Sequence, residues 1–285
     1  MKNAHLKNIF ALILATLFIS TSGVLGKYIT MPVEIITWFR AAIAMAFLYL
    51  YGTFKKIDFS IKSSKDYKPF LISGVLMAAH WVSYFYAIKL SNVALGVLSL
   101  YTFPIIIAFL EPFFLQVKFN PIYILLGLMV LTGLYILTPE FNIDNSQVRG
   151  ILFGVFSAFC YAVRILILKK HVTNYNGTTL MFHQTLITTV LLLPTLFFMD
   201  LSGLKAQFPY LLLLALLSTA IGHSLVLHSL KFFSATTASI ISSLQPIFGI
   251  CLAYLFIREI PSLSTYIGGS FIVLTVVIES IRSKK

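Results

Sequence analysis

The sequence NVALGVLSLYTFPIIIAFLEPFF at residues 92–114 returns in diverged form as SATTASIISSLQPIFGICLAYLF at residues 234–256. Identical positions include Pro104 and Pro246, Ile105 and Ile247, Leu110 and Leu252, and Phe114 and Phe256, each pair 142 residues apart. The same shift relates Ile9 to Ile151, Lys27 to Lys169, Lys89 to Lys231, and Gly127 to Gly269. This spacing indicates that the second half of the chain is a distant copy of the first.

Each half contains five apolar segments, and each segment is close to the roughly 20 residues that a helix needs to cross a bilayer. The predicted spans are Lys7–Lys27, Pro32–Thr53, Pro69–Lys89, Val93–Gln116, Pro121–Thr138, Arg149–Lys169, Thr178–Met199, Pro209–Lys231, Ala235–Ile257 and Ser262–Ile281. Because five is odd, the second half enters the membrane from the opposite side. We therefore predict an all-α integral membrane protein with ten transmembrane helices, in which residues 1–138 and 149–285 form two inverted five-helix repeats.

Composition supports a membrane protein. Of the 285 residues, 59% are hydrophobic and 11% are charged, whereas about 25% of a soluble domain is charged. The net charge of +12 does not predict nucleic-acid binding, because the lysines lie in short loops between apolar segments. The apolar run from Ile9 to Leu25 lacks an A-x-A cleavage site, and we expect it to be an uncleaved first span.

Lysine and arginine also predict the orientation. With the N-terminus inside, 14 of these residues fall on the inner side and 5 on the outer side, Arg40 and Arg164 being within spans. Basic residues concentrate in cytoplasmic loops. Both termini are therefore expected in the cytoplasm.

Three charged residues lie within predicted spans: Arg40, Arg164 and Glu111. A charge near the centre of a membrane helix costs roughly 2.5–3.5 kcal/mol, so these side chains should face the protein interior or a watery cavity. Arg164 is close enough to the inner end of its span to extend toward the surface instead. Glu111 has two interpretations that stay open: it carries a proton, or it is a structural partner of Arg40 or Arg164.

A group of aromatic and polar side chains lies in the middle of the third span. His80 and Tyr84 are four residues apart and Trp81 and Tyr84 three, so they share one helical face. Such a face suits a cavity for a small organic molecule. We assign to the same cavity Tyr101, Tyr161, His223 and Gln245.

Prolines mark expected helix breaks at Pro104, Pro112 and Pro246, since proline cannot donate a backbone hydrogen bond. No metal site is expected, because His223 and His228 are five residues apart and do not point the same way on an α-helix. Cys160 and Cys251 are expected to be small buried side chains. The sequence has no nucleotide-binding motif, and no cofactor is predicted.

These features together resemble a drug/metabolite transporter of the EamA type. The matching stretches are Thr37–Arg40, Tyr86–Ala94, Pro104 with Pro246, and Leu255–Glu259. The resemblance covers essentially the whole chain as two five-helix units. It departs at Val117, which stands where the second copy has Glu259, and at Glu111-Pro112, which has no counterpart in the second copy.

The resemblance implies a central cavity formed by spans 1, 3, 4, 6, 8 and 9, and alternating access. It also implies a multi-pass protein of the bacterial cytoplasmic (inner) membrane that moves a small organic solute such as an amino acid, often outward. The alternatives are a passive facilitator of the same solutes and an integral membrane enzyme. Protons are a candidate coupling partner. The oligomeric state is not predicted, and a monomer is compatible with the sequence.

Overall fold

The computed structural model describes residues 2–116, 118–138, 142–235, 238, 241–242 and 244–282. Every regular element in these ranges is a helix. The longer ones are α1 (Lys2–Tyr28), α2 (Val33–Phe54), α3 (Tyr67–Leu90), α5 (Phe103–Leu115), α6 (Ile122–Leu137), α7 (Ser146–Lys169), α8 (Gly177–Leu192), α9 (Leu204–Leu213), α12 (Leu244–Ile257) and α13 (Leu263–Arg282). The remaining elements are η1 (Ser64–Asp66), α4 (Val93–Leu100), η2 (Leu193–Phe197), η3 (Leu214–His223) and α10 (Ser224–Ser229).

Each predicted span coincides with a helix or a run of consecutive helices, although the ninth, Ala235–Ile257, is only partly described. Within the described ranges, seven helical segments are long and apolar enough to cross a membrane, and three shorter apolar helices accompany them. The chain is therefore a multi-pass helical membrane protein. Val117, one of the departures noted above, lies outside the described residues.

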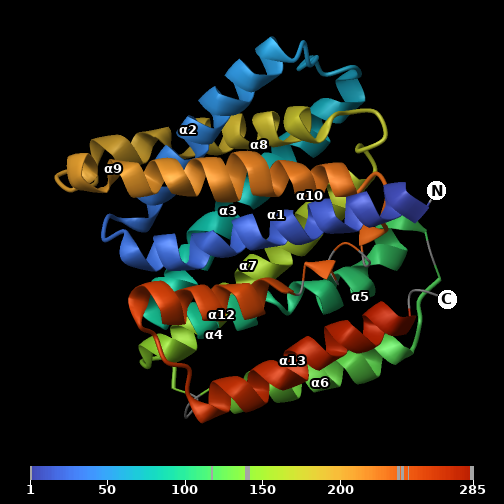
Figure 1. The fold of residues 1–285 in the computed structure, drawn as a ribbon, viewed down its shortest axis with the longest axis vertical. Helices are drawn as coiled ribbons and strands as arrows, with labels where there is room; N and C mark the ends of the chain where they lie inside the picture. The colour runs from blue at the N-terminus through green and yellow to red at the C-terminus, as the bar shows by residue number, and fades with distance from the viewer. Residues whose placement is uncertain are drawn as a thin grey trace.

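Helix packing divides the bundle into a centre and two flanks (Figure 1). The most extensive packing is between α3 and α7, and α1 packs in the centre against η3 and α12. On one flank α2 packs against α8, and on the other α6 packs against α13. Glycines permit the last contact, since a Cβ on Gly133 would come within 2.7 Å of the Gly268 carbonyl oxygen.

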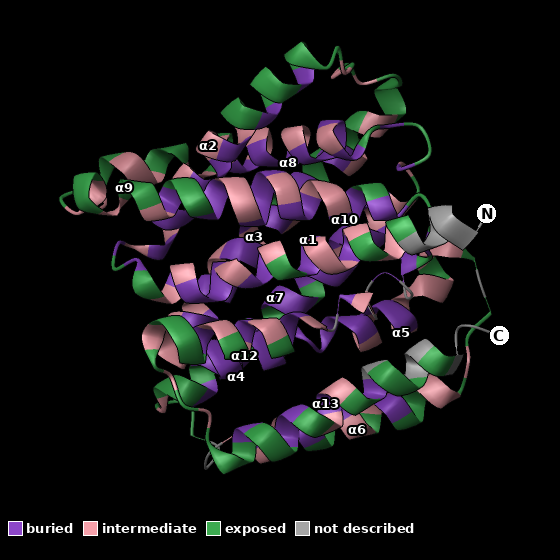
Figure 2. Cartoon of the chain, viewed as in Figure 1, coloured by how far each residue is buried: buried purple, intermediate pink, exposed green. Residues whose placement is uncertain are grey.

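Burial follows this arrangement (Figure 2). Buried residues concentrate on α3, α4 and α7, and exposed faces lie on the outer helices. The exposed faces carry large apolar side chains such as Phe113, Tyr135 and Phe198. An apolar exterior of this extent fits contact with lipid. Cys251, which was expected to be buried, lies exposed on α12, whereas Cys160 is buried.

Two of the three prolines stand at helix starts. Helix α4 ends at Leu100 and α5 begins at Phe103, which places Pro104 in the first turn of α5, where its missing N–H is tolerated. Pro246 has the matching position near the start of α12. The expected break at Pro112 is wrong, because α5 continues through it to Leu115. Packed membrane helices tolerate such a proline when neighbouring groups compensate for the lost hydrogen bond.

Candidate solute-binding pocket

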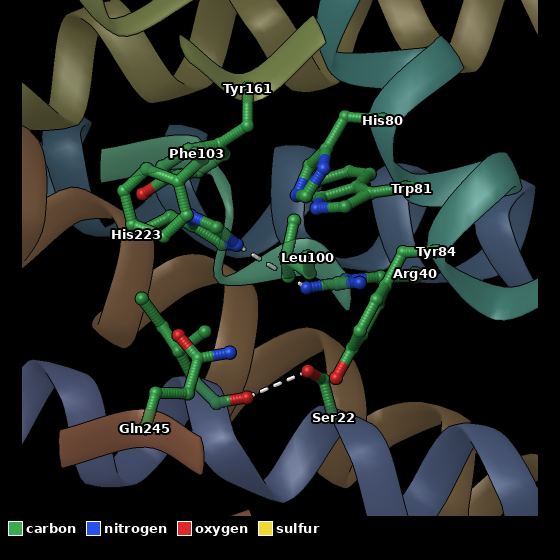
Figure 3. Close-up of a pocket in the computed structure, with 11 residues that line it drawn as sticks. Ser22, Arg40, His80, Trp81, Tyr84, Leu100, Phe103, Tyr161, His223 and Gln245 are labelled. Carbon is green, nitrogen blue, oxygen red and sulfur yellow. Dashed lines mark hydrogen bonds between the residues drawn. The ribbon is translucent and has the colours of Figure 1, made fainter. Parts of the chain in front are cut away.

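A buried pocket lies where the central helices cross (Figure 3). Helices α1, α2, α3, α4, α5, α7, η3 and α12 all contribute to it. Its lining consists of Ile19, Ser22, Arg40, His80, Trp81, Tyr84, Leu100, Phe103, Tyr161, His223 and Gln245. The cavity measures about 20 Å³, which is room for about one water molecule. The pocket is therefore closed in this conformation.

The third-span residues share one face, as their spacing predicts. His80, Trp81 and Tyr84 are buried and line the pocket together. The His80 ring lies 4.9 Å from that of Tyr161 between centroids, and its Nδ1 lies 2.7 Å from Ser157 Oγ. These contacts fix His80 between α3 and α7.

Arg40 extends from α2 into the pocket, and its side chain is fully enclosed by protein. Its Nε donates to Thr219 Oγ1 at 2.6 Å, and its Nη2 donates to Ser218 Oγ at 2.7 Å. The guanidinium carbon lies 4.1 Å from the centre of the Trp81 ring, a cation–π distance. Arg40 is thus held by neutral hydroxyl and aromatic groups. The cavity that the family resemblance implies is formed by spans 1, 3, 4, 6, 8 and 9. It does not include the second span, from which Arg40 extends.

The hydroxyl partners of Arg40 come from a π-helical segment, η3. In a π-helix the backbone hydrogen bonds join residues five apart instead of four, and such segments are frequent at functional sites. Here Ser218 and His223, five residues apart, both approach the Arg40 Nη2, His223 at 3.5 Å. His223 is buried and His228 exposed, so the two histidines point in different directions. Sequence periodicity had not indicated Ser218 or Thr219, because small hydroxyl residues in spans usually serve packing.

Arg164 is also fully buried, so it does not extend toward the membrane surface. Its Nε donates to Gln184 Oε1, and its guanidinium carbon lies 5.2 Å from the centre of the Tyr161 ring. Arg164 therefore lies behind Tyr161, which lines the pocket. Gln184 is 20 residues from Arg164 and lies on the next helix, α8, so no periodicity in the sequence indicates this pairing.

Tyr101 and Gln245 are linked side chains on the α12 side. Tyr101 Oη lies 3.1 Å from Gln245 Oε1 and also donates to the Ser242 carbonyl oxygen. Gln245 lines the pocket, whereas Tyr101 supports it from the layer behind.

Glu111 lies outside this pocket. It is half-buried on α5, and Lys169 is close enough to attract it electrostatically. The hydrogen bonds of the two buried arginines go to Thr219, Ser218, His223 and Gln184. The role of Glu111, as a proton carrier or as a structural partner, therefore stays a prediction.

Several buried polar atoms beside the pocket have no hydrogen-bond partner among the described residues. They are Arg40 Nη1, Arg164 Nη1 and Nη2, Trp81 Nε1, Tyr84 Oη and His223 Nδ1. Buried polar groups are paired in the large majority of cases. So many unpaired polar atoms in one place mark this pocket as the candidate site.

The pocket also follows the internal repeat. Three pairs of its lining residues are 142 positions apart, namely Ile19 and Tyr161, Trp81 and His223, and Phe103 and Gln245. Trp81 and His223 are in contact, with ring centroids 5.7 Å apart. Equivalent positions of the two halves thus meet at one place.

The fold and this pocket define a multi-pass helical membrane protein with an enclosed polar and aromatic site. The chain belongs to the EamA-like transporter family, which matches it twice, over residues 6–138 and 148–281. The family resemblance seen in the sequence motifs is thereby confirmed. Family and relatives point to a transporter rather than an enzyme.

Similar proteins have transporter names. The chain is 25% identical to the pseudopaline exporter CntI of Pseudomonas aeruginosa, over 90% of this chain and 88% of that protein. It is 25% identical to the uncharacterized transporter YxxF of Bacillus subtilis, over 72% and 67%. An uncharacterized transporter of Archaeoglobus fulgidus is 27% identical over 69% and 70%. A crystal structure with 17% identity shares the fold, with a TM-score of 0.72 over 97% of this chain and 96% of its own.

Proposed function

We propose that this protein is a secondary transporter that exports a small organic metabolite, such as an amino acid, across the bacterial cytoplasmic membrane by alternating access. The observation that carries the proposal is the buried pocket formed by helices of both halves. It combines a few polar groups with aromatic walls, which is the usual character of a small-molecule site. The name of one relative, an exporter, supports the outward direction.

In this proposal, residues 1–138 and 149–285 are inverted five-helix repeats, ten spans in all, with both termini cytoplasmic. The 142-residue pairing of pocket residues supports this division. The packing also supports it, because α3 with α7 and α1 with η3 are equivalent contacts between opposite halves. Transporters with inverted repeats bind solutes near the bilayer midplane between the repeats.

The closed cavity of about 20 Å³ corresponds to an occluded conformation in this scheme. Solute sites are usually some 300–1,000 Å³. Binding therefore requires the two halves to move apart on one side of the membrane. A passive facilitator would use the same pocket and the same movement, without coupling to an ion.

Transport by the purified protein in liposomes tests the proposal. Vesicles loaded with one unlabelled amino acid or other metabolite are diluted into a trace of the same labelled solute, and accumulation by counterflow is measured. We expect at least one solute to accumulate only in vesicles that contain the protein. A folded protein that supports counterflow of no metabolite across a broad panel contradicts the transport function.

A further inference from the structure

We infer that the pocket binds an oxyanion group, a carboxylate or a phosphate, of the transported solute, and that Arg40 is the residue that holds it. This inference rests on the proposed transport function and names the class of solute. The transported molecule is then an organic acid, an amino acid or a phosphate ester rather than a neutral or purely cationic compound.

The first observation is a buried positive charge that has no counter-ion among the described residues. Arg40 is fully buried, and its hydrogen-bond partners Thr219, Ser218 and His223 carry no carboxylate. Of the described residues that line the pocket, none is an aspartate or a glutamate. Buried charges are normally paired because desolvation without a partner is costly. An anionic solute would supply the missing partner.

The unpaired atoms point to the same chemistry. Arg40 Nη1 and Trp81 Nε1 are buried without a hydrogen-bond partner in the described part of the chain, and both groups are donors only. The two side chains are stacked at 4.1 Å, so their free donors belong to one small region, and Figure 3 shows the Arg40 guanidinium directed into the pocket. A carboxylate or phosphate offers several acceptor lone pairs in this space.

A second cation strengthens the positive field. Arg164 occupies the position that the 142-residue repeat relates to Ser22, which lines the pocket. It is fully buried, its Nη1 and Nη2 have no partners among the described residues, and it is close enough to Arg40 for the two charges to repel each other. Two buried guanidinium groups around a pocket without a lining carboxylate favour an anion at its centre.

The apolar walls of the pocket indicate what the rest of the solute is like. Phe103 and Tyr161 line the pocket opposite the α3 face, with their rings 4.8 Å apart between centroids. An aromatic or aliphatic body would pack there, while its oxyanion reaches Arg40. This division between an apolar body and one charged end matches the anatomy of small-molecule sites.

The test uses matched probes on the purified wild-type protein at constant chloride concentration. Phenylacetate is compared with its neutral isostere phenylacetamide, L-leucine with L-leucinamide, and phenyl phosphate with phenol, by thermal shift and by equilibrium binding. We expect at least one oxyanion to bind tenfold or more tightly than its partner. Comparison of the carboxylate and phosphate pairs identifies which oxyanion is preferred. No variant is needed for this step, so misfolding cannot obscure the result.

Variants then locate the site. Arg40→Gln should reduce oxyanion binding to the level of the neutral partner, and Arg40→Lys should retain part of it, because lysine keeps the charge without the planar donor pair. Arg149→Gln, which removes an exposed arginine on α7, is the matched control and should leave affinity unchanged.

The inference is overturned if neutral partners bind as tightly as the oxyanions, if no oxyanion binds, or if oxyanion binding survives Arg40→Gln. Equal stabilisation by sulfate would show an unspecific anion site and would also overturn it. If wild-type vesicles meanwhile transport a neutral or cationic metabolite, the inference fails and the transport function stands. Failure of counterflow for every metabolite removes the transport function itself.

Discussion

Lys27 and Lys169, which are 142 residues apart, make the same pair of hydrogen bonds in their respective halves. Lys27 Nζ donates to the carbonyl oxygens of Ile88 at 3.0 Å and Ser91 at 2.9 Å. Lys169 Nζ donates to those of Leu230 at 2.6 Å and Phe233 at 2.7 Å, which are the equivalent positions. Each ammonium thus satisfies carbonyls at a helix C-terminus that have no partner within the helix.

A carboxylate from the other half accompanies each lysine. Glu259 attracts Lys27, and Glu111 attracts Lys169. Glu259 Oε1 also accepts a hydrogen bond from the backbone N–H of Ala94 at 3.2 Å. Each half therefore places a carboxylate near a lysine of the other half. The two carboxylates, Glu259 and Glu111, are not at positions that the 142-residue repeat relates to each other.

We predict that Lys27→Met and Lys169→Met each destabilise the folded protein by about 1–2 kcal/mol, because each removes two hydrogen bonds from a charged donor. Thermal unfolding in detergent measures the effect. Lys205→Met, at a site on α9 for which no such bonds are found in the described residues, serves as the control. A melting temperature unchanged in both lysine variants would show that these contacts contribute nothing to stability.

Trp81→Phe should lower solute affinity about tenfold, since it removes the indole N–H and weakens the cation–π contact with Arg40. Phenylalanine keeps most of the buried volume, so the variant should remain folded. Trp38→Phe is the matched control, because Trp38 Nε1 donates to the Thr189 carbonyl oxygen away from the pocket. That control should cost about 1 kcal/mol of stability with affinity unchanged. Equal affinity of wild type and Trp81→Phe would remove Trp81 from the binding site.

Cysteine labelling in intact cells tests the orientation. Cysteines are introduced at the exposed positions Asn142 and Ser63 in a Cys251→Ser background, because Cys251 is itself exposed. An impermeant maleimide should label position 142 and not position 63 until the membrane is permeabilised. The reverse pattern would place both termini outside.

Glu111→Gln tests proton coupling. As a proton carrier, Glu111 would be needed for transport driven by a pH gradient but not for exchange at equal solute concentrations, so we expect the variant to lose the first and keep the second. Loss of both modes together with a lower melting temperature would instead identify Glu111 as a structural partner of Lys169. Wild-type transport that ignores an imposed pH gradient would make the protein a facilitator.

Gly133→Val should separate α6 from α13, because the new Cβ would lie 2.7 Å from the Gly268 carbonyl oxygen, a backbone atom that cannot easily move. We expect a loss of about 1–3 kcal/mol, typical of overpacking. At Gly249 the nearest atom to a new Cβ is Val97 Cγ2 at an ordinary 3.5 Å, so Gly249→Ala is the control and should unfold at the wild-type temperature. If the Gly133→Val variant unfolds at the wild-type temperature, α6 and α13 can shift to accommodate the larger side chain.

Much of the fold could be predicted because membrane helices are specified locally. Segment length and apolarity locate each span, and the identical residues 142 positions apart reveal the repeat. The spacing of His80, Trp81 and Tyr84 also determines that they share a face, since 3.6 residues make one turn. A buried charge in an apolar span, such as Arg40, must face the interior. The sequence by itself therefore determined the helical membrane class and most of the pocket's members.

Only the tertiary structure decided how those members pair. Arg40 meets Ser218 and Thr219, 178 and 179 residues away on the π-helical segment η3. Glu111 is close enough to Lys169 to attract it electrostatically, and α5 continues through Pro112. Each outcome depends on which helix faces which, and that is determined by packing among distant segments rather than by local periodicity. Composition shows that a charge is buried, whereas only the assembled bundle shows what surrounds it.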